Sequence, residues 1–308
     1  MLDRSGLIAA IFAYTAWGFF PLYWHLLKHI SALETMSHRV IWSFVFYAGV
    51  ASRRGSLPRF TALLKNRRTV LHLTIGAVFL AINWLLYVWA VTHGHVMETS
   101  LGYFINPLLN IAVGSLFLKE HLSRNQKLAL SIATLGILWL TVDYGRPPWI
   151  ALALAFSFAT YSIVKKLVPG EATLISMAET LVLFPVAICA AIAIRRLGPT
   201  SDIALIQTPE ALSAIDFVFL VVGGAVTGIP LLLFGVAAQR LPLTVLGFFQ
   251  YLAPTFQFLS AVLFFNEPLG GSRLVGFSMI WLALAIFIYD TWRSRNARAR
   301  RAGTPLER

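Results

Sequence analysis

Residues 101–120 read LGYFINPLLNIAVGSLFLKE, and residues 246–267 read LGFFQYLAPTFQFLSAVLFFNE. In both stretches a proline follows the LG pair, and a glutamate follows that proline by the same 13 residues, at Glu120 and at Glu267. The shared order and spacing indicate an internal repeat. The alternative is a chance similarity between two apolar helices.

The composition of the chain is that of a membrane protein. Of its 308 residues, 58% are hydrophobic and 12% are charged, whereas soluble domains carry about 45–50% and about 25%. The apolar residues gather in runs of roughly 18–25 residues, and in lipid a helix pairs its own backbone groups. The first run lacks a small-residue cleavage site, so we interpret it as a span rather than a signal peptide. We therefore expect an all-α integral membrane protein with ten transmembrane helices, at residues 5–25, 36–52, 70–91, 97–118, 126–143, 148–166, 172–194, 215–238, 244–265 and 273–291.

The basic residues predict the orientation of these helices. If the N-terminus is cytoplasmic, the cytoplasmic segments hold 19 of the 25 lysines and arginines, the external segments hold five, and Arg39 lies within a span. Cytoplasmic loops carry the excess of basic residues in membrane proteins. We therefore expect a multi-pass protein of a bacterial-type inner membrane with both termini in the cytoplasm. Residues 293–308 carry six arginines and should form a disordered, basic cytoplasmic tail.

The repeat divides the ten predicted helices into two halves of five, at residues 1–145 and 146–292. Because five is odd, the second half must cross the membrane in the opposite direction to the first. Inverted repeats are a common construction of secondary transporters, which place the substrate near the bilayer midplane between the halves. The pattern therefore predicts a carrier with a central cavity.

Four sequence blocks carry a family resemblance: HRVIWS at 38–43, NWLLYVWAV at 83–91, SLGYFINPLLN at 100–110 and LGFFQYLAPT at 246–255. Over residues 4–292 the chain resembles the RarD-type branch of the EamA group in the drug/metabolite transporter superfamily. The resemblance implies an inner-membrane exporter or permease with two EamA repeats, which moves small organic metabolites or drug-like molecules by alternating access. RarD-type proteins are named for chloramphenicol sensitivity or permease activity, so it also implies a relation to chloramphenicol.

Two charged residues lie inside predicted spans. A charge at the bilayer centre costs about 2.5–3.5 kcal/mol on insertion scales, so such residues usually face the bundle interior. Three interpretations of Arg39 are open. It is either an anchor for an anionic or carboxylate-bearing substrate, a member of a structural ion pair, or an interfacial residue whose side chain snorkels to the outer surface. Glu179 corresponds to Arg39 at a shift of 140 residues, so we expect pseudo-symmetric sites between the halves. A desolvated Glu179 is also a candidate to carry a coupling proton; the alternative is a structural hydrogen bond.

Prolines occur at matching places in the fourth and ninth predicted spans, at Pro107 and Pro254. Proline removes a backbone donor and disturbs the preceding turn, and discontinuous helices in corresponding positions of two halves point to a transport site. We expect both prolines to break their helices. The alternative is a simple kink with interhelical hydrogen bonds of about 1 kcal/mol each. The candidate pathway residues beside them are Tyr103, Asn106, Asn110, Gln250 and Tyr251.

The third predicted span adds Asn83, Trp84 and Tyr87 to the candidate pathway. An asparagine among apolar residues should face protein or water rather than lipid. The two aromatic residues either line a pocket or belong to an interfacial belt.

Several kinds of chemistry are missing from the sequence. No phosphate-binding loop and no nucleophile–base motif occurs, and the single cysteine, Cys189, excludes an intrachain disulfide. His93 and His95 have no third ligand nearby, and Glu98 is explained as a helix cap. We therefore expect no enzymatic activity, no cofactor, no metal and no nucleic-acid partner.

The sequence thus predicts a secondary transporter whose partners are a small-molecule substrate and the lipid bilayer, with proton coupling as a hypothesis. Uptake of amino-acid-like metabolites is the first alternative to export. A membrane sensor or scaffold that transports nothing is the second, and the short loops argue against it. An intramembrane enzyme is the third, and the spans lack the facing catalytic groups that it would need.

Overall fold

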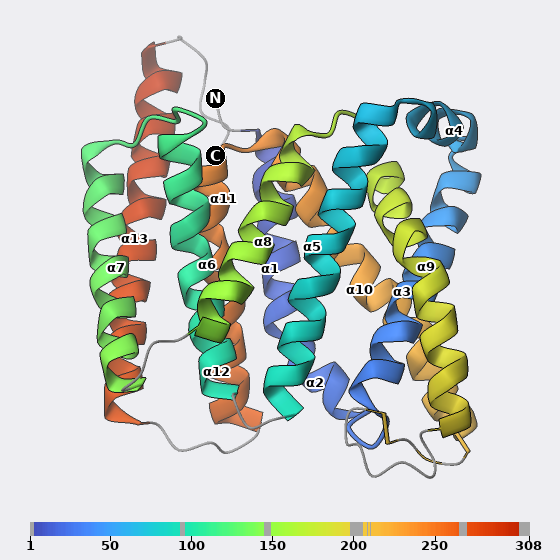
Figure 1. Ribbon diagram of the computed structural model, residues 1–308. Coiled ribbons are helices and arrows are strands. Elements are labelled where there is room, and N and C mark those ends of the chain that lie inside the picture. The colour runs from blue at the N-terminus through green and yellow to red at the C-terminus, as the bar shows by residue number, and fades with distance from the viewer. Residues whose placement is uncertain are drawn as a thin grey trace.

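The computed structural model describes residues 3–92, 96–144, 149–197, 206–207, 209, 211–264 and 270–301. These residues form thirteen α-helices and contain no strand. Figure 1 shows the helices side by side in one bundle. In chain order they are α1 (Arg4–Gly18), α2 (Phe20–His25), α3 (Ala32–Arg53), α4 (Leu57–Lys65), α5 (Arg67–Thr92), α6 (Val96–Leu116), α7 (Arg124–Tyr144), α8 (Trp149–Leu167), α9 (Ala172–Leu197), α10 (Ala214–Arg240), α11 (Leu243–Gln250), α12 (Leu252–Phe264) and α13 (Gly271–Arg301).

The helices are those of an integral membrane protein. Large apolar side chains are exposed on the bundle, among them Phe12, Phe117 and Val186, and exposed apolar surface of this kind is typical of a face that meets lipid. In the described part of the chain, six helical segments are long and apolar enough to cross a membrane: Arg4–His25, Arg67–Tyr87, Trp149–Leu167, Ala172–Leu197, Ala214–Arg240 and Leu274–Arg293. Each predicted span overlaps a helix or a pair of short helices, and the count of ten spans stays a prediction.

Two features of the helices differ from expectation. The first predicted span is divided at Phe19 into α1 and α2, because Pro21 has no N–H to continue the helical ladder. At the other end of the chain, α13 continues to Arg301 through a segment that we expected to be disordered. That segment is rich in arginine and alanine, which are strong helix formers; residues 302–308 lie outside the described part.

Helices α3 and α9 form an antiparallel pair, which Figure 1 shows at one side of the bundle. At one end Arg195 Nε, near the end of α9, lies 2.6 Å from Glu34 Oε1, near the start of α3. At the other end Tyr47 of α3 packs in the same apolar cluster as Leu174 and Ile175, near the start of α9. Residues at the same distance from the first residue of α3 and of α9 therefore lie toward opposite ends of the bundle.

Two further pairs join distant parts of the sequence. In the first, Ser123 at the start of α7 bonds to Asp290 of α13 at 2.7 Å, and Trp139 near the end of α7 donates to the Ser272 carbonyl at 3.1 Å. In the second, the Glu120 carboxylate accepts hydrogen bonds from the first two backbone N–H groups of α11, both at 2.8 Å. Glu120 therefore caps α11 from the segment that follows α6.

We expect Glu34→Ala to lower the free energy of unfolding by about 2 kcal/mol. Glu34 is fully buried while Arg195 is 30% exposed, and this pair lies between an exposed pair, worth about 0–1 kcal/mol, and a fully buried one, which costs about 3–5 kcal/mol to break. Chemical denaturation in detergent measures the change. Arg59→Ala is the control, because Arg59 is 68% exposed and 3.7 Å from Glu171; equal effects would contradict the prediction.

Candidate functional site

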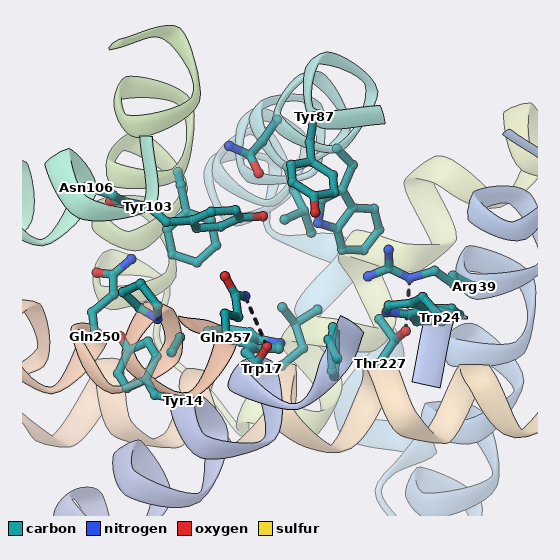
Figure 2. Close-up of a pocket in the computed structure, with 18 of the residues that line it drawn as sticks. Tyr14, Trp17, Trp24, Arg39, Tyr87, Tyr103, Asn106, Thr227, Gln250 and Gln257 are labelled. Atoms are coloured by element: carbon teal, nitrogen blue, oxygen red, sulfur yellow. Dashed lines mark hydrogen bonds between the residues drawn. The ribbon is translucent and has the colours of Figure 1, made fainter. Parts of the chain in front are cut away.

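A cavity of about 120 Å³ lies inside the bundle and is lined by residues of nine helices (Figure 2). Eight of its nineteen lining residues are aromatic, and none of them is acidic. The wall is therefore largely apolar, with a few polar groups placed around it, as is usual for small-molecule sites. The lining residues are Tyr14, Trp17, Phe20, Trp24, Met36, Arg39, Leu80, Asn83, Trp84, Tyr87, Tyr103, Asn106, Phe158, Thr227, Leu231, Gln250, Ala253, Pro254 and Gln257.

Arg39 supplies the positive charge of the cavity. Its guanidinium carbon lies 4.6 Å from the ring centroid of Trp24 and 4.8 Å from that of Trp84, within the range of cation–π attraction. Its Nε donates to Thr227 Oγ1 at 3.1 Å, and its Nη1 contacts Met36 Sδ at 3.1 Å. Within the described residues, no ion pair joins Arg39 to a carboxylate. A guanidinium has five N–H donors, so donors remain for an anion in the cavity.

Amide and hydroxyl groups lie at the end of the cavity opposite Arg39, as Figure 2 shows for Asn106, Gln250 and Tyr14. In the described part of the chain, Asn106 Oδ1 and the Tyr14 hydroxyl are buried without a hydrogen-bond partner. Gln250 Oε1 accepts from Asn110 Nδ2 at 2.7 Å, which leaves the amide nitrogen of Gln250 for the cavity. Buried polar atoms without partners are rare in folded proteins, so this end of the cavity is suited to a polar ligand group.

Prolines remove backbone donors at three places on the cavity wall. A proline takes away the N–H that would bond to the carbonyl four residues before it, so Pro21, Pro107 and Pro254 affect the carbonyls of Trp17, Tyr103 and Gln250. All three of these residues line the cavity. The Trp17 carbonyl accepts instead from Gln257 Nε2 at 3.2 Å.

The predicted helix break occurs near one of the two matched prolines. α11 ends at Gln250 and α12 begins at Leu252, so the interruption lies just before Pro254, which falls in the first turn of α12. α6 contains Pro107 and continues past it, so the expected break at Pro107 is not present. A Cβ at Gly247 would lie 2.8 Å from the Pro107 carbonyl oxygen; α11 therefore packs directly on the α6 backbone, which supports the helix at this point.

The predicted residues of the third span lie on the cavity wall together with Tyr103. Asn83 Nδ2 donates to the Leu154 carbonyl at 2.9 Å and to Ser157 Oγ at 3.0 Å, both on α8. The rings of Tyr87 and Tyr103 meet edge to face at 5.7 Å. Trp84 and Tyr87 are therefore pocket residues in this structure.

Three predicted site residues are not part of the cavity wall. Asn110 lies behind Gln250 and positions its side chain, and Tyr251 is fully buried in the apolar core. Glu179 is paired with Lys165, whose Nζ lies 2.6 Å from Glu179 Oε2. Arg39 and Glu179 therefore do not converge on one cavity, because the antiparallel α3 and α9 carry these equivalent positions toward opposite ends of the bundle.

Several functional candidates were not identified from the sequence. Trp17, Trp24, Thr227 and Gln257 line the cavity, and only Gln257, a polar residue one turn after Pro254, gave a usable signal. Lys165 counted among the loop cations, although its side chain is fully buried.

Some of the residues discussed above lie outside the described part of the chain: His93, His95, Glu267 and the side chain of Glu98. Among the described residues, no group of three or more His, Cys, Asp or Glu side chains could hold a metal ion.

The fold is that of a multi-pass membrane protein with an internal, largely apolar cavity, and comparison with known proteins gives its class, a membrane transporter, and its family. The EamA-like transporter family matches residues 4–142. The chain is 42% identical to Protein RarD of Escherichia coli, over 93% of this chain and 95% of that protein. It is also 42% identical to an uncharacterized transporter of Pseudomonas aeruginosa, over 94% and 95%. The chain belongs to the EamA-like transporter family, in its RarD branch, and is a transporter of the bacterial inner membrane.

A solved crystal structure supports the fold independently. It aligns with a TM-score of 0.69 over 92% of this chain and 98% of that one, at 17% sequence identity. At that identity the likeness concerns the fold alone.

A double-mutant cycle tests the link between Asn110 and Gln250. We expect Asn110→Ala to lower the free energy of unfolding by about 1–3 kcal/mol, because it leaves the buried Gln250 Oε1 without a donor. In the Gln250→Leu background the same change should cost less, since the bond is already absent. Denaturation of the four proteins in detergent gives the coupling energy, and additive effects would show that the 2.7 Å contact contributes nothing.

Proposed function

We propose that the protein is a secondary carrier of small organic molecules that bear a carboxylate at one end, an apolar centre and a hydrogen-bond donor at the other. The observation that carries the proposal is the Arg39 guanidinium, which forms no ion pair within the described residues, in an aromatic cavity whose nineteen described lining residues include no acid.

The charge and size of the cavity support this class of substrate. A guanidinium presents a planar fork of donors that matches a carboxylate, while a wall without an acid among its described residues disfavours cations. The cavity volume of about 120 Å³ approaches the roughly 150 Å³ of an apolar cavity known to bind benzene. The site therefore has room for about one ring or a comparable aliphatic group in this conformation.

The far end of the cavity favours a donor on the substrate. Asn106 Oδ1 is an acceptor without a partner among the described residues, and an N–H or O–H of the substrate would satisfy it. Because Figure 2 places Arg39 and Asn106 at opposite ends, the preferred ligand has its anionic group and its donor separated by an apolar middle.

Helix packing supports the inverted-repeat part of the proposal, with ten spans in halves at 1–145 and 146–292. α1 packs on α10 as α8 packs on α5, and α3 packs on α10 as α9 packs on α5. α3 also packs on α9, α7 on α13 and α6 on α11. This pattern is unchanged when each helix of one half is exchanged with its counterpart in the other, as an approximate two-fold relation requires. The counterparts are α1 and α8, α3 and α9, α5 and α10, α6 and α11–α12, and α7 and α13. Alternating access would then consist of the two halves rocking around the cavity, with both termini in the cytoplasm.

Export is the direction that follows from the RarD resemblance, with uptake of amino-acid-like metabolites as the alternative. The sequence lacks a phosphate-binding loop, so a substrate or ion gradient is the expected energy source. Chloramphenicol and proton coupling belong to the proposal as hypotheses to be tested in the same assay.

A matched set of ligands tests the cavity chemistry. We expect 4-hydroxybenzoate to bind purified protein at least about tenfold more tightly than 4-hydroxybenzamide, because a hydrogen bond to a charged group is worth about 1.5–3 kcal/mol. Arg39→Gln should remove this preference. Benzoate, which lacks the donor, should bind about fivefold more weakly than 4-hydroxybenzoate, and Asn106→Leu should remove that difference. Titration calorimetry measures the affinities of the three ligands for the wild type and the two variants; an unchanged preference in Arg39→Gln would refute the anion site.

Transport is tested with protein in liposomes and a panel of amino acids, organic acids and antibiotics that includes chloramphenicol. We expect exchange of carboxylate-bearing members, reduced at least about tenfold in Arg39→Gln through loss of the charged contact. Runs with and without a proton gradient, applied in each direction, report coupling and direction. Exchange of neutral compounds that is insensitive to Arg39→Gln would contradict the proposal.

A further inference from the structure

A second charged site lies outside the cavity. Lys165 of α8 and Glu179 of α9 are 0% and 1% exposed, and Lys165 Nζ lies 2.6 Å from Glu179 Oε2. Lys165 Nζ also donates to Ser176 Oγ at 2.8 Å, and the Tyr161 hydroxyl donates to Glu179 Oε2 at 3.3 Å. The pair is therefore fully buried, and within the described residues one oxygen of the carboxylate is hydrogen-bonded and the other is not.

A glycine on α10 leaves room for Lys165, because a Cβ at Gly235 would lie 2.9 Å from Lys165 Cε. Gly76 of α5 lies beside the carboxylate, where a Cβ would be in van der Waals contact with Glu179 Oε1 at 3.6 Å. Glu179 Oε1 is buried and has no hydrogen-bond partner in the described part of the chain. Burying two charges stabilises a protein only when the remaining polar atoms are also satisfied. A pair with an orphaned oxygen is therefore poorly built as a permanent structural bridge.

An aromatic partition separates the pair from the cavity. Phe158 lines the cavity and lies 5.7 Å from the ring of Tyr161 and 5.6 Å from that of Phe234. The rings of Tyr161 and Phe234 stack at 5.9 Å behind it. Trp17, another wall residue, closes the layer at 5.6 Å from Phe234. Because Tyr161 also bonds to Glu179, a movement of this partition and a change in the ion pair are mechanically linked.

The repeat relates this pair to the Arg39 site. Arg39 and Glu179 each lie seven residues after the first residue of their helices, Ala32 and Ala172. On the preceding helices, the shift of 140 residues that relates Arg39 to Glu179 takes Trp24, whose ring covers the Arg39 guanidinium, to within one residue of Lys165. The pair therefore occupies, near the opposite end of the bundle, the place that corresponds to the anchor of the cavity.

We propose that Lys165 is a second anion-binding residue of the transport pathway. In this conformation Glu179 occupies the position at which Lys165 would bind the carboxylate of the substrate. When the aromatic partition opens and the Arg39 side closes, the carboxylate of the substrate replaces Glu179 at Lys165. This inference rests on the proposed carrier function for its ligand, but the accessibility of Lys165 is tested without any substrate.

Cysteine labelling tests whether the pair becomes accessible. Cys189→Ser removes the only cysteine, and Ser176→Cys then places a thiol beside Lys165. In nanodiscs, labelling rates are measured with an anionic reagent, 2-sulfonatoethyl methanethiosulfonate, and a cationic one, 2-(trimethylammonium)ethyl methanethiosulfonate. Each rate is divided by the rate of the same reagent with 2-mercaptoethanol, which corrects for the intrinsic reactivity of the reagent. We expect labelling with a preference of about tenfold for the anionic reagent, as expected for a unit charge a few ångströms away. Lys165→Gln should abolish the preference, and Glu179→Gln should increase it.

The cavity supplies the positive control, Thr227→Cys in the same cysteine-free background. If the Thr227→Cys variant is labelled and the Ser176→Cys variant is not, the pair is a sealed structural bridge and the proposal is wrong. Equal rates for the two reagents in the Ser176→Cys variant, or a faster cationic reagent, would overturn it as well.

A double variant covers the case in which single substitutions fail to fold. Replacing a buried ion pair by apolar residues of similar size usually preserves stability, so Lys165→Met with Glu179→Met should keep the unfolding midpoint. We expect this double variant to bind 4-hydroxybenzoate with the affinity of the wild type, because the Arg39 end is unchanged. Counterflow of the radiolabelled compound should fall at least about tenfold. Liposomes with Arg39→Gln give the baseline for leakage. Undiminished counterflow would overturn the role of Lys165. If the wild type itself neither binds nor exchanges the compound, the proposed function fails, and the labelling result decides the accessibility of Lys165 by itself.

Discussion

In hydrocarbon, every backbone N–H and C=O group has to find its partner inside the protein. This requirement explains why the described chain is helical, and it also explains where the helices are irregular. Three of the prolines that remove a donor from the ladder, Pro21, Pro107 and Pro254, act on the carbonyls of residues that line the cavity; Pro185 and Pro230 also lie inside helices. Irregular backbone is tolerated at membrane depth where it borders protein or a cavity, and three of these defects border the cavity. The Gln257 side chain, which bonds to the Trp17 carbonyl, is one of the groups that compensates.

Much of this architecture could be predicted from the sequence, because long apolar runs and proline positions depend on local properties of the chain. The convergence of Arg39, Asn83, Asn106 and Gln250 on one cavity followed from the same reasoning, since polar groups inside a span avoid lipid. The position of Glu179 did not follow. A shift along the sequence relates Arg39 of α3 to Glu179 of α9, but the two helices are antiparallel, so these positions lie toward opposite ends of the bundle. Lys165 was hidden for a related reason, because a lysine near the end of a span has the same local sequence whether it faces water or a buried carboxylate.

In the proposed inverted repeat, the two halves share a packing pattern but differ in their charges. One half presents Arg39, a cation surrounded by aromatic rings and open to the cavity. The corresponding place in the other half holds a cation and an anion that neutralise each other behind a layer of aromatic rings. Under the proposed inverted repeat, the two ends of the pathway therefore differ in their electrostatics, and the two states of the proposed carrier would differ in free energy.

The interruption at Tyr251 has a mechanical consequence. α11 is fixed to the other half of the chain, because Glu120 holds its first N–H groups and Gly247 seats it on the Pro107 carbonyl. α12 starts anew at Leu252 and carries Gln257, which is bonded to α1 through the Trp17 carbonyl. Tyr251 would therefore act as a hinge. A bend there would leave α11 in place against α6, while α12 would move together with α1 and change the width of the cavity between them.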